Sequence, residues 1–499
     1  MSLRRSSIWF LLAVSAIFLQ VCQGHAEETV SVAWPAAEEE ASVAALPTDD
    51  KEESKKVFNL DEIVVTGTKS PHMLKDAPVE ISVITRKEIE DAGIQTLVDA
   101  VKWVSGLNIS GGAPFGASRR FTALINGLPS QYTMILVDGV KIKSEHIHTG
   151  INLSVVPIDI IEKIEVLKGP ASALYGSEAF GGVINIITRP IPKKPSFGAS
   201  LGYGTFNTID ANLSHGGGIG RFGYFLSGNL INTDGANGAW YTQSNALVKT
   251  VYNLTDNDDL NFHGKYYLNN YLKSNEGQID YSYDLVLGWK RSLGGGDSLK
   301  TDVSHVNFTG SAADCTNMSY GADVVYQGRF FERNFITAGL DVTLDSFERT
   351  ATPLHSQTIY GIYLQDEFTL NEVLESVLSA RTDIHSRVGT VLTPKGALLY
   401  RVTPRTNLRV SVGQGFRAPS LQDLYEVHYP HKTYYRDGNP DLKPEFSMNY
   451  NVGIEQIFNK VILGRLSLYR NDFTNMIGIV DTGETDMYGA DAWSVKKRP

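Results

Sequence analysis

The chain has 499 residues, of which 42% are hydrophobic and 20% charged, and its formal net charge is −10 at pH 7. The acidic balance argues against a nucleic-acid-binding protein, which needs a basic face. With only 2 cysteines the chain cannot build a disulfide-rich or Cys-rich zinc framework. Its 46 glycines and 10% aromatic residues favour a sheet-rich protein with many turns.

The N-terminus has the pattern of an export signal. Arg4 and Arg5 precede an apolar stretch at residues 8–21, and Gln-Gly-His-Ala follows at 23–26. This order predicts a secretory signal peptide over residues 1–26. A membrane anchor is the alternative, but the stretch is too short to span a bilayer. A lipoprotein signal at Cys22 is another, but it lacks the small residues expected before the cysteine.

Two segments of different character follow the signal. Residues 27–60 are rich in Ala, Glu, Asp and Pro without an apolar period, which predicts a flexible acidic linker. Residues 61–190 predict a small α+β domain, with strands at 78–85, 134–138 and 161–167 and helices at 86–92 and 96–104. Thr85 and Glu88 form a capping-box pair at the start of the first helix. Asp138-Gly139 predicts a tight turn.

Residues 191–499 change to a period of two. Phe197, Ala199, Leu201 and Tyr203 alternate with Ser and Gly, and similar runs occur at 209–213, 222–226, 360–368 and 408–412. Such alternation, interrupted by glycine turns, is typical of a transmembrane β-barrel. A soluble β-sandwich also alternates, but it would have to bury over a dozen such strands in its core.

Several motifs resemble those of TonB-dependent outer-membrane receptors. Residues 164–177 (Ile-Glu-Val-Leu-Lys-Gly-Pro-Ala-Ser-Ala-Leu-Tyr-Gly-Ser) and 181–188 (Gly-Gly-Val-Ile-Asn-Ile-Ile-Thr) are similar to the plug of that family. Residues 415–420 and 438–445 resemble two of its barrel motifs. The resemblance covers about residues 60–480. It implies a plug domain inside a transmembrane antiparallel β-barrel. The plug motif comprises Lys168, Gly169, Pro170, Tyr175, Gly176, Gly181 and Gly182.

The resemblance also implies an energy source and partners. The family takes up scarce iron complexes, haem or cobalamin when a TonB–ExbB–ExbD complex of the inner membrane pulls on a short segment, the TonB box. We expect that box at Asp61, Glu62, Ile63, Val64, Val65 and Thr66. A short β-prone segment with unpaired edges can add to a partner's sheet. An ordinary first plug strand is the alternative for this segment, and residues 28–32 are a rival TonB box.

Two departures from the family pattern affect the contact between plug and barrel. Asn126 and Lys168 occupy positions where the family commonly has arginine, and Asn451 aligns with a barrel glutamate. An arginine–glutamate latch would here be replaced by a neutral hydrogen bond, which lacks charge assistance. The alternative is an alignment error of one residue.

The ligand stays open at this stage. His428 and His431 lie between the two barrel motifs, and His146 and His148 follow the Asp138-Gly139 turn. Imidazole is a natural axial ligand of haem iron, yet such loops also bind siderophores. We expect a ferric siderophore, with haem and cobalamin as alternatives and Arg417 and the four histidines as candidate contacts. No intrinsic cofactor or metal is expected, and a turn at residues 256–259 reads as solvated aspartates rather than a calcium site.

Other function classes fit less well. The sequence contains no phosphate-binding loop, no Gly-x-Ser-x-Gly elbow and no His-Glu-x-x-His motif, so an enzyme is not expected. A passive porin would be blocked by the plug. A signal transducer needs a folded domain before the TonB box, and residues 27–60 are too few for one.

The length of the barrel region is unusual for the family. Residues 191–499 number 309 (499 − 190), which at roughly 20 residues per strand and connection gives about 15 strands. The family's barrels have 22 strands. We therefore expect an incomplete barrel from a truncated or frame-disrupted receptor, with about the last ten residues not native barrel sequence. A shorter closed barrel or a transport-inactive remnant are alternatives.

Overall fold

The structure is a computed structural model. It describes residues 62–111, 121–143, 152–273, 276–311, 314–427, 429–431, 434–459, 462–485 and 491–497. The predicted signal peptide, the acidic linker, Asp61, His146, His148 and His428 lie outside these residues. Within the described chain, every helix is too short or too polar to cross a membrane.

The N-terminal part of the described chain forms a plug domain around a five-stranded sheet. The strand order is β3-β8-β9-β6-β7, in which β6 and β9 are parallel and the other pairs are antiparallel. Two small hairpins, β1-β2 and β4-β5, complete the domain. Its strands are β1 (Ile63–Val64), β2 (His72–Met73), β3 (Ile81–Thr85), β4 (Leu107–Gly111), β5 (Phe121–Ile125), β6 (Thr133–Val137), β7 (Val140–Lys141), β8 (Ile161–Lys168) and β9 (Gly182–Thr188). Its helices are α2 (Arg86–Asp91), α3 (Leu97–Val101) and α4 (Ser172–Tyr175), with 3-10 turns at Leu74–Asp76, Ser130–Tyr132, Leu153–Val155 and Ile158–Ile160.

Local signals explain the plug helices. Helix α2 begins with the predicted capping box, in which the Thr85 hydroxyl and the Glu88 carboxylate each bind the other residue's backbone N–H. Helix α3 is shorter than predicted. The N–H groups of Trp103 and Val104 bind carbonyls three residues back, so the last turn tightens before Gly106 at φ +77°.

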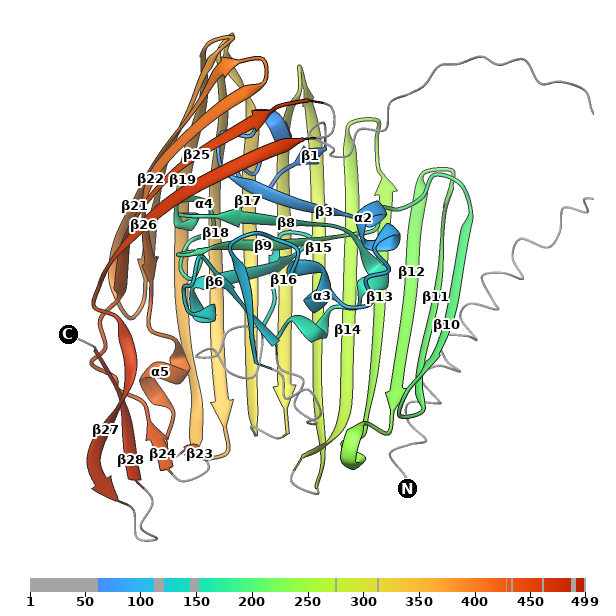
Figure 1. Ribbon diagram of the computed structural model, residues 1–499, viewed down its shortest axis with the longest axis vertical. Coiled ribbons are helices and arrows are strands. Elements are labelled where there is room, and N and C mark those ends of the chain that lie inside the picture. Colours follow the sequence, from blue (N-terminus) through green and yellow to red (C-terminus); the bar gives the residue numbers. More distant parts are fainter. Residues whose placement is uncertain are drawn as a thin grey trace, which may run out of the picture. The chain divides into compact units, whose positions relative to one another are not determined.

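The rest of the described chain forms mainly one antiparallel sheet of 15 strands, which confirms the predicted number. Neighbours in sequence are neighbours in the sheet, and β10 and β26 are its two edges, so the described strands form an open sheet rather than a closed barrel. Figure 1 shows these barrel strands curving around the plug strands, which run across them. The strands are β10 (Ser196–Gly204), β11 (Thr208–Ile219), β12 (Phe222–Thr233), β13 (Tyr241–Asn253), β14 (Asp258–Lys273), β15 (Glu276–Gly294), β16 (Asp297–Gly310), β17 (Cys315–Phe331), β18 (Asn334–Arg349), β19 (Thr352–Asn371), β20 (Leu374–His385), β21 (Gly389–Thr403), β22 (Thr406–Arg417), β25 (Glu445–Ile457) and β26 (Leu463–Thr474).

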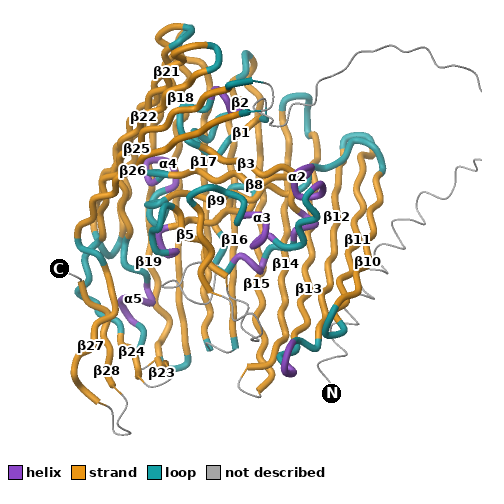
Figure 2. The backbone as a smooth tube through the Cα atoms, in the orientation of Figure 1, coloured by secondary structure: helices purple, strands orange, loops and turns teal. Residues whose placement is uncertain are grey.

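The connection between β22 and β25 is much longer than the other connections between barrel strands. A 3-10 turn at Ala236–Gly238 lies between β12 and β13, and most other connections are short turns. Between β22 and β25 the chain instead forms α5 (Leu421–Tyr425), β23 (Tyr429–His431) and β24 (Tyr434–Asp437). These strands join β27 (Ile477–Thr485) and β28 (Asp491–Lys497) in a separate four-stranded sheet, visible beside α5 in Figure 2.

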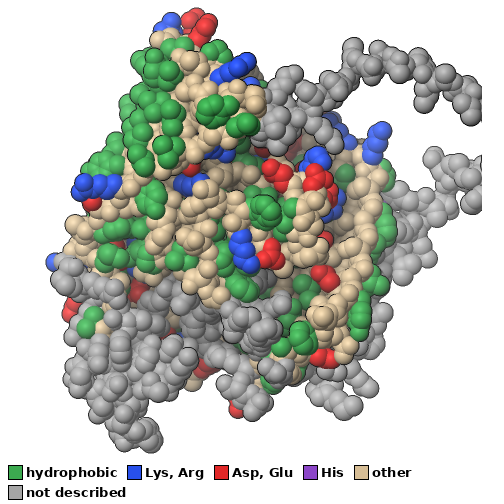
Figure 3. All heavy atoms as spheres, viewed as in Figure 1, with side chains coloured by type: hydrophobic (Ala, Val, Ile, Leu, Met, Phe, Trp, Pro, Cys, Tyr) green, Lys and Arg blue, Asp and Glu red, His purple; other side chains and the backbone are tan. Residues whose placement is uncertain are grey.

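The predicted alternation separates the two faces of the barrel sheet. On β19, Tyr360, Ile362 and Leu364 are 54%, 51% and 56% exposed, whereas Gln365 and Glu367 are 0% and 4% exposed. The apolar residues therefore face outward, as a bilayer requires, and the polar residues face the plug. In Figure 3, hydrophobic side chains cover barrel strands near the margins of the view, while charged side chains gather over the plug in its centre.

The plug packs directly on the barrel wall. The main apolar cluster of the plug includes buried residues of β6, β8 and β9 and extends to Phe225, Leu247 and Tyr267 of the barrel. A second cluster joins the plug to Val377 and Ala397. Plug and wall therefore share buried apolar surface, which stabilises the plug in the lumen.

Candidate functional site

The described part of the predicted TonB box is held inside the plug. The Glu165 carboxylate on β8 is fully buried and accepts hydrogen bonds from the Val65 N–H at 3.0 Å, the Thr66 N–H at 2.9 Å and the Thr66 hydroxyl at 2.6 Å. Tyr175 donates its hydroxyl to the Thr66 carbonyl at 2.9 Å, and Asn185 donates to the Thr66 hydroxyl at 3.1 Å. Burial, and then the Glu165 charge, raise the pKa of Tyr175, so it stays a donor. The buried Glu165 carboxylate, together with Tyr175 and Asn185, thus anchors the end of this segment.

The next residues run along the barrel wall, and we call residues 68–77 the wall-contact segment. Gln365 and Gln327 donate to the carbonyls of Thr68 and Lys69, each at 2.7 Å. Arg409 donates to the Ala77 carbonyl at 2.9 Å. Backbone groups of the plug are therefore fixed by side chains of the wall, at hydrogen bonds worth about 0.5–1.5 kcal/mol each.

Lys69 makes the same connection through its side chain. Its Nζ lies 2.9 Å from the Tyr363 hydroxyl and 4.3 Å from the centre of that ring. Burial lowers the pKa of Lys69, although the neighbouring Asp323 opposes this shift. The Lys69 side chain of the wall-contact segment is thus buried against the barrel wall instead of being solvated.

Two glycines of the plug motif occupy positions where the backbone conformation or a neighbouring atom leaves no room for a Cβ. At Gly182, φ is +150° and a Cβ would lie 2.4 Å from the Leu167 carbonyl oxygen. At Gly176, φ is +74° and a Cβ would meet the Arg381 guanidinium of the wall at 3.2 Å. These two positions explain the motif sterically. Gly182 allows β9 to lie close to Leu167 of β8 in the plug sheet, and Gly176 allows the plug to lie against Arg381 of β20.

The contact around Lys168 differs from the latch that the family implies. Lys168 forms its ion pair with Glu80 of the plug, at 3.2 Å, rather than with a barrel residue. Asn451 of β25 lies against Gly169, where a Cβ would be 2.7 Å from its Nδ2. Asn126, Lys168 and Asn451 line one cavity of about 490 Å³. The three residues line the same cavity, but Asn451 donates to Ser411 of the neighbouring strand β22 at 3.5 Å, and the predicted neutral hydrogen bond between Asn126 and Asn451 does not form among the described residues. The plug–barrel contact there is the packing of Asn451 against Gly169.

The strongest buried charge network lies at Arg417. Its Nη1 is 2.5 Å from a Glu445 oxygen and its Nη2 is 2.7 Å from Asp423, and all three side chains are at most 1% exposed. The second Glu445 oxygen accepts from the Tyr132 hydroxyl of the plug at 2.7 Å. Burial and the Glu445 charge raise the pKa of Tyr132. Arg417 is a predicted ligand contact; here its Nη1 and Nη2 join the β22–β25 connection and β25, whereas its buried Nε has no hydrogen-bond partner among the described residues.

A charged cavity of about 250 Å³ lies between plug and wall. Its plug side holds Lys141 and Lys143, which pair with Glu178 at 2.6 Å and with Asp345 of the wall at 2.7 Å. Burial opposes the charge of Lys141, but Glu178 and Asp345 outweigh it and raise its pKa. Its wall side holds Arg381, paired with Asp341 at 2.6 Å.

The charge of this cavity is slightly negative. The lining cations are Lys69, Lys141, Lys143 and Arg381, and the lining carboxylates are Glu178, Asp302, Asp323, Asp341, Asp345 and Asp383. The lining therefore has no cationic excess. Its volume also lies below the ~300–1,000 Å³ of typical ligand sites, so a whole chelate does not fit there unless the plug moves.

The histidine candidates are only partly placed. His146, His148 and His428 lie outside the described residues, and for His431 the structure gives the backbone alone, in β23. In the turn at 256–259, Asp258 accepts from Thr255 at 2.7 Å and Asp259 from Asn253 at 2.5 Å. These aspartates are thus engaged by neighbouring side chains of the turn.

Comparison with known families agrees with the plug and the barrel seen in the structure. A model described as the TonB-dependent receptor-like β-barrel matches residues 194–494, and one described as the TonB-dependent receptor plug domain matches residues 73–183. The chain belongs to the TonB-dependent receptor family. It is therefore an outer-membrane protein with a plug and a β-barrel.

Individual relatives of this TonB-dependent receptor are distant but cover most of it. The vitamin B12 transporter BtuB of Vibrio vulnificus strain CMCP6 is 27% identical over 461 residues, which cover 84% of this chain and 71% of that protein. The iron-regulated outer membrane virulence protein of Vibrio cholerae serotype O1 strain N16961 is 26% identical over 479 residues, 83% and 69% of the two chains. The siderophore receptor PirA from Pseudomonas aeruginosa superposes with a TM-score of 0.70 at 20% identity, over 84% of this receptor and 79% of PirA. This last likeness shows the shared fold.

Several residues that organise the receptor's lumen were not predicted. Glu165, Glu367 and Arg381 each join segments far apart in sequence. The strand at 161–168 carries four charged residues, so the sequence did not single out Glu165. For Glu367 and Arg381, the alternation of β19 and β20 predicted only that the side chains face inward, and it did not predict which residues they contact.

Proposed function

We propose that this receptor takes up a metal chelate, a ferric siderophore, across the outer membrane when force is applied to its N-terminal segment. The outer membrane holds no ATP, so a TonB–ExbB–ExbD complex of the inner membrane would supply the force from the proton gradient. The observation that carries the proposal is the wall-contact segment. It directly follows the predicted TonB box and ties plug to wall through Thr68, Lys69 and Ala77.

A pull at residues 61–66 would load these contacts in sequence. The contacts of the pulled residues themselves would break first: the pairing of β1 with β2, the Lys163 ion pair with Glu62, and the Glu165 hydrogen bonds to Val65 and Thr66. The bonds from Gln365 and Gln327 to the wall-contact segment would follow. Their loss would free that side of the plug from β17 and β19 and open a path from the charged cavity.

The ligand class rests on relatives and on charge. Two similar structures are named siderophore receptors and others ferric enterobactin receptors, which supports a ferric siderophore as cargo. Once the plug has moved, the cavity lining, with six carboxylates and four cations, would face the passing ligand and so favours a chelate without a large negative charge, such as a ferric hydroxamate, over a polyanionic ferric catecholate. Cobalamin is the second candidate, because three of the similar relatives are named vitamin B12 transporters and corrinoids also lack a large negative charge.

In this proposal the receptor binds its cargo without transforming it, and no resident cofactor takes part. The metal arrives as part of the chelate and leaves with it. A transport-inactive remnant is an outcome of the test below.

The experiment compares binding and uptake in cells that express either the full chain or a variant lacking residues 61–66. The probes are ⁵⁵Fe-loaded hydroxamate and catecholate siderophores and ⁵⁷Co-cyanocobalamin. We expect one uncharged probe to accumulate with the full chain and to bind, without accumulating, with the deletion. Accumulation that survives the deletion would contradict the role of the segment. Failure of all three probes to bind the full chain would contradict the ligand class.

A further inference from the structure

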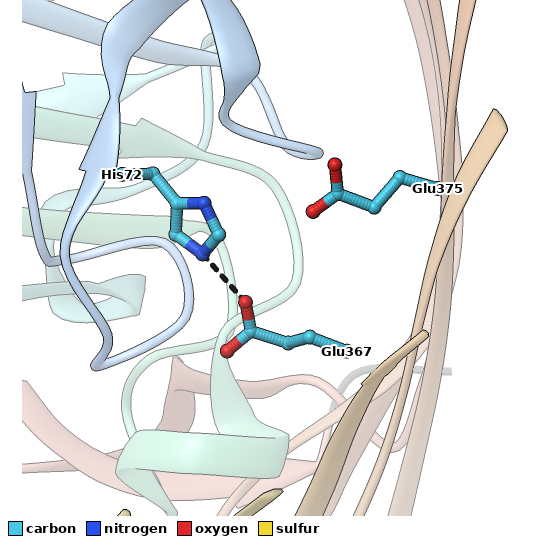
Figure 4. A group of neighbouring side chains, drawn as sticks. All are labelled: His72, Glu367 and Glu375. Carbon is cyan, nitrogen blue, oxygen red and sulfur yellow. Dashed lines mark hydrogen bonds and ion pairs between the residues drawn. The ribbon is translucent and has the colours of Figure 1, made fainter. Parts of the chain in front are cut away.

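Three metal-ligating side chains converge where the wall-contact segment meets the barrel. His72 lies on β2 of the plug, Glu367 on β19 and Glu375 on β20. One ligand atom from each lies within 4.8 Å of the others. Figure 4 shows the two carboxylates reaching from neighbouring wall strands toward the imidazole of the plug. The closest pair, His72 Nε2 and a Glu367 oxygen, is 2.5 Å apart.

The surrounding contacts fix these donors in place. Ser70 donates to the other Glu367 oxygen at 2.5 Å, and Gln365 donates to that same oxygen at 3.1 Å. Glu375 accepts from Arg401 at 3.1 Å. Such contacts around the ligands orient carboxylates toward a metal and raise its affinity. The Glu367 oxygen that faces His72 is left for one shared cation, either a proton or a metal ion.

The local charge also calls for a cation. Glu367, Glu375 and Asp76 carry three negative charges, and Arg401, which is bound to both Asp76 and Glu375, carries one positive charge. With neutral His72 the balance is −2 (−3 + 1), which one divalent ion would neutralise. The group therefore attracts positive charge.

We propose that His72, Glu367 and Glu375 bind one zinc ion that joins the plug to the barrel wall. Zinc takes one imidazole and two carboxylates in a tetrahedral site and completes it with water. Bond lengths of about 2.0–2.2 Å place tetrahedral ligands roughly 3.4 Å apart. His72 and Glu367 must then separate by about 1 Å, which side-chain rotation supplies. The side chains of His72 and Glu375 are 18% and 11% exposed, so the ion can enter from the lumen.

The position of the site gives it a mechanical consequence. An ion held by one plug residue and two wall residues would fasten the wall-contact segment to β19 and β20. This consequence for the opening of the plug rests on the proposed function. The binding of the ion does not, because it depends only on the three side chains.

The test is zinc titration of the purified, chelator-treated full chain in detergent by isothermal calorimetry, together with the metal content after dialysis. We expect one zinc per chain, with affinity reduced at least tenfold in His72→Ala and in Glu375→Gln. His263→Ala is the matched control, because this lumenal histidine lies beside Asp138, at 3.6 Å, and outside the cluster. It should bind zinc as the parent does.

Cobalt supplies an independent readout of the ligands. Co²⁺ in the same site should show the intense visible bands of tetrahedral coordination, and these should be lost in His72→Ala while the far-ultraviolet circular dichroism is unchanged. Zinc binding that is weak and without fixed stoichiometry, or equal in the parent and in His72→Ala, would overturn the proposal. The His72–Glu367 contact would then be held by a proton alone.

Discussion

Removal of the Arg417 guanidinium tests the buried network most sharply. In Arg417→Met the Glu445 and Asp423 carboxylates, both fully buried, lose their shared cation at 2.5 and 2.7 Å. Removing one partner of a buried ion pair costs about 3–5 kcal/mol, because an uncompensated charge stays in a low-dielectric site. The two pairs share one guanidinium, so the cost is not doubled. The expected loss corresponds to roughly two to four orders of magnitude in the folding equilibrium.

The assay is urea unfolding of the chain in detergent micelles, followed by tryptophan fluorescence. Arg470→Ala is the control, because this arginine pairs with Asp472 on the exposed face of β26 and its side chain is 75% exposed. Its unfolding midpoint should not move. The triple variant Arg417→Met, Asp423→Asn, Glu445→Gln should recover at least half of the lost stability, because no buried charge is left unpaired.

Two outcomes would refute this reasoning. If Arg417→Met unfolded at the same urea concentration as the parent, the network would not carry the buried charges as described. If its stability were unchanged while ligand affinity fell, Arg417 would be the ligand contact predicted from the sequence. Measuring both the unfolding stability and the ligand affinity of Arg417→Met therefore distinguishes a structural role of Arg417 from a ligand-binding role.

Three further predictions follow from single side chains. Gly182→Ala should lose about 1–3 kcal/mol of stability in the same urea assay, since its Cβ would lie 2.4 Å from the Leu167 carbonyl oxygen. The control Gly277→Ala should be as stable as the parent, because a Cβ at Gly277 meets open space. Equal losses of stability at both sites would contradict the steric argument. Glu165→Gln should expose residues 62–66 to limited proteolysis, since one buried carboxylate holds two backbone N–H groups there; an unchanged cleavage pattern would mean that other contacts suffice. Burial disfavours the Asp138 carboxylate, but Lys249 and His263 outweigh it and hold its pKa below the usual value, so its stabilisation is complete above the unfolded-state pKa and is lost as the pH falls through the folded-state pKa. Asp138→Asn should therefore flatten the acid side of the stability–pH curve, and an acid limb as steep as in the parent would refute this assignment.

The parts of the fold set by neighbouring residues could be predicted from the sequence. The Thr85–Glu88 capping box needs only four consecutive positions, and the Asp138-Gly139 turn only two, with φ values of +49° and +85° in the structure. The alternation of β19 likewise predicted which residues face outward. Each of these features depends on periodicity or on local hydrogen bonding.

The parts that depend on contacts between distant residues could not be predicted. Glu165 is 99 positions from Thr66, and Glu367 is 295 positions from His72. No local pattern specifies which inward-facing wall residue meets which plug residue, because that depends on strand register and on how the plug sits in the lumen. Family resemblance marked Gly176 and Gly182 as a motif, but only the structure showed that one faces Arg381 and the other the Leu167 carbonyl.

The measurement that tests the central claim most directly is uptake by a receptor whose plug is reversibly locked to the wall. A cysteine pair at Pro170 of the plug and Gly413 of β22 would form the lock in a Cys315→Ser background, because a Cβ at Gly413 would lie 3.0 Å from the Pro170 Cβ, close to the separation that a disulfide needs. We expect the oxidised form to bind the transported probe without accumulating it in cells, and reduction by dithiothreitol to restore accumulation. Undiminished accumulation with the disulfide intact would contradict a plug that must leave the wall for its ligand to pass.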